Sequence, residues 1–276
     1  VALIVYGHGA GKLRTEDYHP HQIVLFRHGV AFLLMLMLFM PRHGWRIVVP
    51  RRPGLQILRG LVGIASSVFY FTGLATTSLA TAAAIGFTAP IMVTALSVPL
   101  LAEKVGVRRW AAVGVGFLGA LIISRPGADG DAGMAEWAAL YLVASAASAA
   151  IYQIITRKLA GQDHAETTNI WSGLVGAAVM CVLAPFVWTP PADLWVWLHF
   201  ISMGLVGGTA HYLLTKAFER GPASLLSPFN YLQLLGATGT GYLLYRQLPD
   251  GWTWLGAAVI VAAGLYIAQR ERKLRR

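Results

Sequence analysis

The segment that decides the fold runs from Leu61 to Ala102 and reads LVGIASSVFYFTGLATTSLATAAAIGFTAPIMVTALSVPLLA. It contains no Asp, Glu, Lys or Arg over 42 residues. A helix of this length would be about 63 Å long, because each residue adds about 1.5 Å. The hydrocarbon core of a bilayer is about 30 Å thick, so the segment is expected to cross a membrane twice. The polar run Thr76-Thr77-Ser78 is the expected turn between the two crossings.

The composition of the whole chain agrees with this segment. Of its 276 residues, 56% are hydrophobic and 12% are charged, and the mean hydropathy is +0.59. An average soluble domain is about 25% charged. These values exclude a disordered chain, and the single cysteine, Cys181, excludes a disulfide scaffold. The net charge of +10 would suit a nucleic-acid binder, but such a protein gathers its cations on a polar face that this composition does not provide.

Other runs with few charges predict seven further complete spans. A complete span needs about 20 apolar residues, and the predicted spans cover 22–40, 57–76, 79–102, 108–124, 135–156, 167–188, 195–216, 222–245 and 251–269. The apolar, glycine-rich run 1–13 would be a helix of only about 20 Å. We expect it to be the second half of a first helix whose beginning is absent from this sequence, with a short re-entrant segment as the alternative. The predicted fold class is therefore all-α, a polytopic membrane protein of ten transmembrane helices, the first incomplete.

The charges are distributed unequally between the two predicted sides of the membrane. If loops alternate between sides, one side carries 17 Lys and Arg, including Arg59, with 5 acidic residues, and the other carries 4 with 7. Arg27 lies about five residues inside a predicted span and is counted with neither side. Lys and Arg collect on the cytoplasmic side of membrane proteins. We therefore expect a multi-pass protein of the inner (plasma) membrane with both termini in the cytoplasm.

The two halves of the chain show a weak internal repeat. Residues 75–126 align with 217–270: Ala75 matches Ala217, and Trp110 matches Trp254. Each unit would contain five helices, and because five is odd, the two units would have opposite orientations in the membrane. Inverted repeats of this kind are typical of secondary transporters, whose substrate site lies at the repeat interface near the middle of the membrane.

Several motifs resemble those of the drug/metabolite transporter superfamily, in its EamA-type branch of five plus five helices. They are Gly11-Lys12 with Phe26-Arg27, the run from Ala84 to Pro90, Leu100-Leu101-Ala102-Glu103 before Arg108-Arg109-Trp110, and the run from Tyr152 to Leu159. The chain departs from the pattern at Arg246, where the family usually has a glutamate like Glu103.

The resemblance implies an organisation and a function. We expect residues 1–126 to form the first five-helix repeat, 134–270 the second, and 271–276 a basic cytoplasmic tail. The implied function is transport of a small organic metabolite by alternating access, the candidates being amino acids, nucleoside-like compounds, vitamins such as riboflavin, and S-adenosylmethionine. The expected partners are this substrate and the lipid bilayer, with no nucleic acid, and the protein would be a monomer or a homodimer. No cofactor and no metal site is expected.

Polar and aromatic residues inside the spans are the candidates for substrate contact, because such side chains usually face a cavity or bond to another helix. The candidates are His8, Arg27, Tyr70, Thr88, Tyr152, Gln153, Trp171, His211, Tyr212, Asn230 and Gln233. Pro90 and Pro228 are expected to interrupt their helices, since broken helices often form such sites; a simple kink is the alternative.

Each candidate also has a purely structural interpretation. His8 and His211 could bond to a neighbouring helix. Arg27 could extend to the outer interface, or it could pair with an anionic substrate group or a backbone carbonyl. Asn230 and Gln233 share one helix face and form the best polar pair.

The predicted spans lack the residues that catalysis or a carboxylate proton relay would need. No Asp or Glu lies deep in a predicted span, so histidine, as His8 or His211, is the candidate group if transport is coupled to protons. The sequence contains no zinc-protease motif and no serine-nucleophile motif. An intramembrane enzyme is therefore not expected, and a scaffold or channel that does not transport is the remaining alternative.

Overall fold

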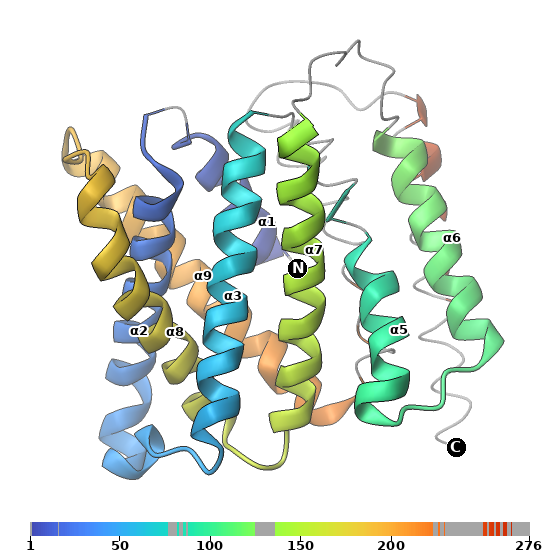
Figure 1. Cartoon of the computed structure of the whole chain (residues 1–276), viewed down its shortest axis with the longest axis horizontal. Coiled ribbons are helices and arrows are strands. Elements are labelled where there is room, and N and C mark those ends of the chain that lie inside the picture. Colours follow the sequence, from blue (N-terminus) through green and yellow to red (C-terminus); the bar gives the residue numbers. More distant parts are fainter. Residues whose placement is uncertain are drawn as a thin grey trace.

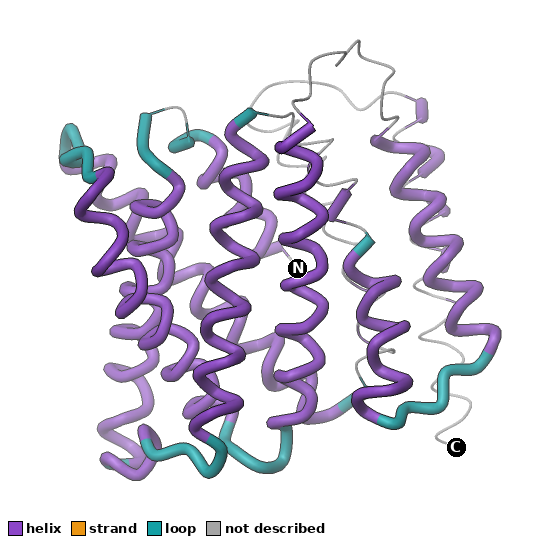
Figure 2. The backbone as a smooth tube through the Cα atoms, viewed as in Figure 1, coloured by secondary structure: helices purple, strands orange, loops and turns teal. Residues whose placement is uncertain are grey.

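The computed structural model describes residues 2–15, 17–76, 82, 85–86, 88–124, 136–222, 226, 229, 251–252, 254–256, 258–259, 262–263 and 266. Within these residues the regular elements are helices, and one isolated bridge joins Ala160 and Asp163 (Figure 2). The helices are α1 (Ala2–Lys12), α2 (Pro20–His43), α3 (Pro53–Ala75), α5 (Ala89–Leu101), α6 (Val107–Ser124), α7 (Glu136–Leu159), α8 (Ala165–Leu183) and α9 (Leu194–Arg220). Two short 3-10 segments follow α2 and α8, η1 (Trp45–Val48) and η2 (Ala184–Val187).

Four segments of the described part are long and apolar enough to cross a bilayer. They are Pro20–His43, Pro53–Ala75, Trp137–Leu159 and Ala165–Val187. Each overlaps a predicted span and extends past it by up to four residues, because helices continue into the polar ends that the charge pattern assigns to loops. The predicted spans 222–245 and 251–269 fall mostly outside the described residues.

The N-terminal part of the predicted span 79–102 is described only at residues 82, 85, 86 and 88. Helix α5 begins at Ala89, so Pro90 lies in its first turn and not at the centre of a longer described helix. The first turn tolerates proline because its N–H groups have no partner inside the helix.

The connections between helices lie at two opposite ends of the bundle (Figure 1). The α2–α3, α5–α6 and α7–α8 connections share one end, which we call the basic end because it carries Arg42, Arg46, Arg51, Arg52, Lys104, Arg108, Arg157 and Lys158. The α1–α2 and α8–α9 connections lie at the other end, where Asp193 accepts a hydrogen bond from the Val196 N–H and caps α9.

Helix α2 packs between α8 and α9 along a series of glycines. A Cβ atom at Gly173 of α8 would lie 2.8 Å from Phe32 Cα, and one at Gly208 of α9 would lie 2.9 Å from Ala31 Cβ. A Cβ at Gly204 would collide with Val30. Small residues such as Gly173, Gly204 and Gly208 let two helix backbones approach closely.

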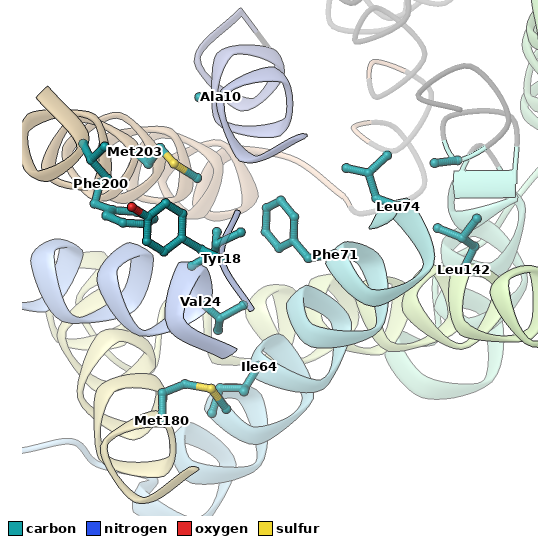
Figure 3. Close-up of a cluster of buried hydrophobic side chains, with 13 residues drawn as sticks. Ala10, Tyr18, Val24, Ile64, Phe71, Leu74, Leu142, Met180, Phe200 and Met203 are labelled. Atoms are coloured by element: carbon teal, nitrogen blue, oxygen red, sulfur yellow. The ribbon is translucent and has the colours of Figure 1, made fainter. Parts of the chain in front are cut away.

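The buried apolar side chains of α3 fill the space that α1, α2 and α9 leave. Figure 3 shows Phe71 pointing from α3 toward Tyr18 and α2, below the part of α1 that carries Ala10. Phe71 and Leu74 are fully buried. A Cβ at Gly11 of α1 would collide with the Phe71 ring, so this glycine lets α1 lie directly on the ring.

Candidate functional site

Arg27 lies inside the bundle and not at the outer interface. Its side chain is 8% exposed, and its Nη2 donates a hydrogen bond to His211 Nε2 of α9 over 3.2 Å. The guanidinium carbon lies 5.9 Å from the centre of the Phe71 ring. Gly207 of α9 makes room for it, because a Cβ there would lie 3.4 Å from Arg27 Nε. Of the alternatives for Arg27, extension to the interface is wrong.

His211 connects Arg27 to α7. Its Nδ1 lies 3.4 Å from the Tyr152 hydroxyl, and the two rings meet edge to face with centroids 5.8 Å apart. An arginine can only donate, so His211 Nε2 accepts and carries no hydrogen. The neutral imidazole therefore holds its hydrogen on Nδ1 and donates it to the Tyr152 oxygen, a tautomer that we infer from these bonds. Arg27, His211 and Tyr152 thus form a polar chain across α2, α9 and α7.

Arg59 is fully buried, although the charge pattern predicted a loop cation on one side of the membrane. Charge counting assigned it to the cations of the basic end, but its side chain is fully buried between α3, α7, α8 and α9. Its guanidinium donates to five oxygen acceptors: the hydroxyls of Thr156 (2.7 Å), Tyr152 (2.6 Å), Thr215 (3.2 Å) and Ser172, and the Thr168 carbonyl (2.9 Å). These use all five of its N–H groups.

The hydroxyls around Arg59 are oriented to accept. Thr156 donates its own hydrogen to the Tyr152 carbonyl, Thr215 donates to the His211 carbonyl, and Ser172 to the Thr168 carbonyl, each one turn back in its helix. Their lone pairs therefore remain for the guanidinium. A signal in the sequence could have revealed this role: Gln56, Arg59 and Gly63 share one face of α3, and small residues beside a polar one are typical of a helix-packing face.

Tyr212 belongs to a different cluster from its neighbour His211. Its hydroxyl donates to Glu166 Oε1 over 2.8 Å, and the same carboxylate oxygen lies 3.1 Å from Lys216 Nζ. Glu219 lies 3.4 Å from Lys216 and accepts a hydrogen bond from the Ala165 N–H. This cluster joins the start of α8 to the end of α9 at the basic end.

The structure places four further candidates away from the polar chain or at its edge. Tyr70 packs edge to face on Phe71 with centroids 5.5 Å apart, beside Arg27. The Thr88 hydroxyl donates to the Ile85 carbonyl over 2.7 Å. The Trp171 indole donates to the Val48 carbonyl over 2.8 Å and so holds η1 against α8. Gln153 is buried on α7, at 7% exposure.

The remaining candidates lie outside what the structure describes. Asn230, Gln233 and Pro228 are not among the described residues, and His8 is described only as part of the α1 backbone. No group of three or more possible metal ligands occurs in the described part of the chain. A hollow of about 550 Å³ is lined by Leu33, Leu36, Met37, Met40, Pro41, Gly44 and Trp45. Its lining is apolar and it lies at the basic end of α2, so it takes no part in the polar chain.

Comparison with known proteins identifies the family. Residues 7–125 and 136–269 match the EamA-like transporter family. The chain is 32% identical to a riboflavin transporter of Rhizobium johnstonii over 254 residues, which cover 91% of this chain and 82% of that protein. It is 30% identical to an S-adenosylmethionine uptake transporter of Rickettsia bellii over 256 residues (92% and 86%). It is 28% identical to the pseudopaline exporter CntI of Pseudomonas aeruginosa over 256 residues (91% and 87%).

A solved crystal structure shares the fold. It superposes with a TM-score of 0.82 over 100% of this chain and 96% of its own, at 20% sequence identity. The chain belongs to the EamA-like transporter family: it is a multi-pass membrane protein that transports a small molecule, and it is not an enzyme.

Proposed function

We propose that the chain is a secondary-active carrier that moves a small organic metabolite by alternating access and binds it beside Arg27, Tyr152 and His211. The observation that carries this proposal is the polar chain across α2, α9 and α7. Ionisable side chains inside a membrane protein are costly and usually mark a substrate or ion pathway.

The proposed substrates are metabolites of the size of an amino acid, a nucleoside, a vitamin or S-adenosylmethionine. Relatives named for riboflavin and S-adenosylmethionine support this range. Tyr70, which is only partly buried, packs against Phe71 beside Arg27, and its ring offers an aromatic surface that suits a substrate with a planar ring.

The site is proposed to lie between two inverted repeats, residues 1–126 and 134–270, with a basic tail at 271–276. The match to the family in two separate segments supports this division. His8, Asn230 and Gln233 would complete the site from the helices that contain them, and Thr88 with Pro90 would contribute from the start of α5.

The basic end is proposed to face the cytoplasm across the inner membrane. The cations gathered on the α2–α3, α5–α6 and α7–α8 connections support this orientation, because positively charged loops stay in the cytoplasm. Both termini would then be cytoplasmic as well.

Reconstitution into liposomes tests the proposal. Uptake of riboflavin, S-adenosylmethionine, amino acids and nucleosides is measured against empty liposomes, together with stabilisation of the detergent-purified protein by each compound. We expect saturable uptake and a raised melting temperature for one of these classes. A protein that neither transports nor is stabilised by any of them would be a scaffold or channel, and the proposal would be wrong.

A further inference from the structure

The hydrogen-bond donors of Arg27 are mostly unused. A guanidinium has five N–H groups, and Arg27 gives one of them to His211. Its Nε and Nη1 have no hydrogen-bond partner among the described residues. The side chain is 8% exposed, so these donors lie inside the bundle and away from bulk solvent.

Tyr152 presents one more donor to the same region. Its oxygen accepts from Arg59 Nη2 at 2.6 Å and from the protonated Nδ1 of His211 at 3.4 Å. Two accepted bonds use both lone pairs of the hydroxyl. The hydroxyl hydrogen then has no acceptor within the described part of the chain. The polar chain therefore offers donors alone to a substrate.

The charge of Arg27 also lacks compensation. No carboxylate in the described residues forms an ion pair with it; the described ion pairs join Lys216 to Glu166 and Glu219. Arg59, which likewise has no carboxylate partner there, is solvated by five oxygens. A buried charge without a partner or a full set of hydrogen bonds is strongly unfavourable. Of these two buried arginines in the described part of the chain, Arg27 is therefore the one that lacks both a carboxylate partner and a full set of hydrogen-bond acceptors.

From these three observations we infer that the substrate carries a carboxylate that binds Arg27, and a second, neutral acceptor that takes the hydrogen of the Tyr152 hydroxyl. This inference rests on the proposed function and narrows its substrate class. A carbonyl pair on a neutral ring would also accept from Arg27, but it would leave the buried charge uncompensated. A carboxylate satisfies the donors and the charge together, and charge-assisted bonds of this kind are about twice as strong as neutral ones.

Matched acids and esters test the inference on the full chain purified in detergent. The probes are S-adenosylmethionine, tryptophan and pantothenate, each with its methyl ester, and riboflavin as a neutral ring compound. Dissociation constants are measured for the wild type, Arg27→Gln, Arg27→Lys and Arg46→Gln. The last variant is the control, because Arg46 is exposed in η1. Melting temperatures without ligand show whether each variant is folded.

We expect one acid to bind the wild type about tenfold or more tightly than its ester, the value of a charge-assisted hydrogen bond. This ratio should fall to near one in Arg27→Gln, remain partly in Arg27→Lys, which keeps the charge, and be unchanged in Arg46→Gln. If riboflavin or an ester binds as tightly as any acid, or if Arg27→Gln keeps the ratio, the carboxylate inference is overturned while the proposed carrier function stands. If no probe binds or is taken up, the proposed function fails first.

Discussion

Arg27 and Arg59 are both buried, but they use their hydrogen-bond donors in different ways. Arg59 donates to five oxygens from three helices, whereas Arg27 donates once to His211. The first arrangement joins helices, and the second leaves four N–H groups without an acceptor among the described residues. Arg27 was identifiable in the sequence because it interrupts an apolar span. Arg59 was not, because a cation near the start of a helix looks like an ordinary loop charge.

Replacement of Arg59 tests its structural role. In Arg59→Gln an amide with two N–H groups faces five acceptors, so at least three lose their partner. Since a hydrogen bond to a charged group contributes about 1.5–3 kcal/mol, we expect a loss of about 3 kcal/mol or more of stability. The melting temperature in detergent should fall clearly, while Arg46→Gln should melt like the wild type. Equal melting of Arg59→Gln and wild type would show that this network does not hold the bundle.

The state of His211 gives a prediction about pH. Protonation of His211 would place an N–H opposite the Arg27 N–H and add a second positive charge, so we expect this ring to stay neutral during transport. In His211→Gln the amide oxygen can accept from Arg27 and the amide nitrogen can donate to Tyr152. Uptake by this variant should keep the pH profile of the wild type, whereas His211→Leu should lose about tenfold in affinity by removing both bonds. A profile that becomes flat in His211→Gln alone would show that His211 titrates.

At the scale of helices, the pattern of charges located the main spans but not their ends. The predicted span 22–40 became Pro20–His43 and the predicted span 195–216 became Leu194–Arg220, since helices continue through residues such as Arg42 whose side chains reach polar surroundings. Pro90 was read as an interruption, and α5 begins beside it. The sequence also does not show which partner each residue of a helix contacts. His211 and Tyr212 are consecutive and therefore point in different directions from α9, His211 toward Tyr152 and Tyr212 toward Glu166.

The glycine contacts of α2 predict which small residues matter. Gly173→Ala would place a methyl group 2.8 Å from Phe32 Cα, so α2 and α8 must separate. Gly29 of α2 has nothing within 4 Å of its Cβ position, and Gly29→Ala is the matched control. We expect Gly173→Ala to lower the melting temperature. Gly29→Ala should leave it unchanged or raise it, because alanine favours helix by about 1 kcal/mol. Equal effects of the two substitutions would contradict the proposed packing of α2.

For the whole molecule, the sequence predicted a membrane protein with strongly unequal ends, and the described connections gather at two ends (Figure 1). The family and the absence of enzyme chemistry also followed from motifs and composition, and the comparisons confirm both. The site was predictable only in part. The structure brings together three of the predicted polar residues, Arg27, Tyr152 and His211. It places two others elsewhere: Trp171 bonds to the Val48 carbonyl, and Tyr212 bonds to Glu166. Which polar side chains contact one another depends on how each helix is rotated about its own axis, and the composition of the helices does not determine this rotation.

Orientation can be tested through the single native cysteine. In a Cys181→Ala background, Arg46→Cys places a thiol at the exposed basic end, and Ala192→Cys places one at the exposed opposite end. A maleimide that does not cross membranes should label Ala192→Cys in intact cells and label Arg46→Cys only after permeabilisation, because basic loops stay in the cytoplasm. The reverse pattern would contradict the proposed orientation.

The claim that a substrate binds at Arg27 inside the bundle is tested most directly by uptake into liposomes that contain the wild type, Arg27→Gln or Arg46→Gln. With the best substrate of the panel at a concentration below its KM, the account predicts equal uptake by wild type and Arg46→Gln. Uptake by Arg27→Gln should be about tenfold or more lower, since a charge-assisted bond to the substrate is lost. Uptake by a folded Arg27→Gln protein at the wild-type rate would contradict it.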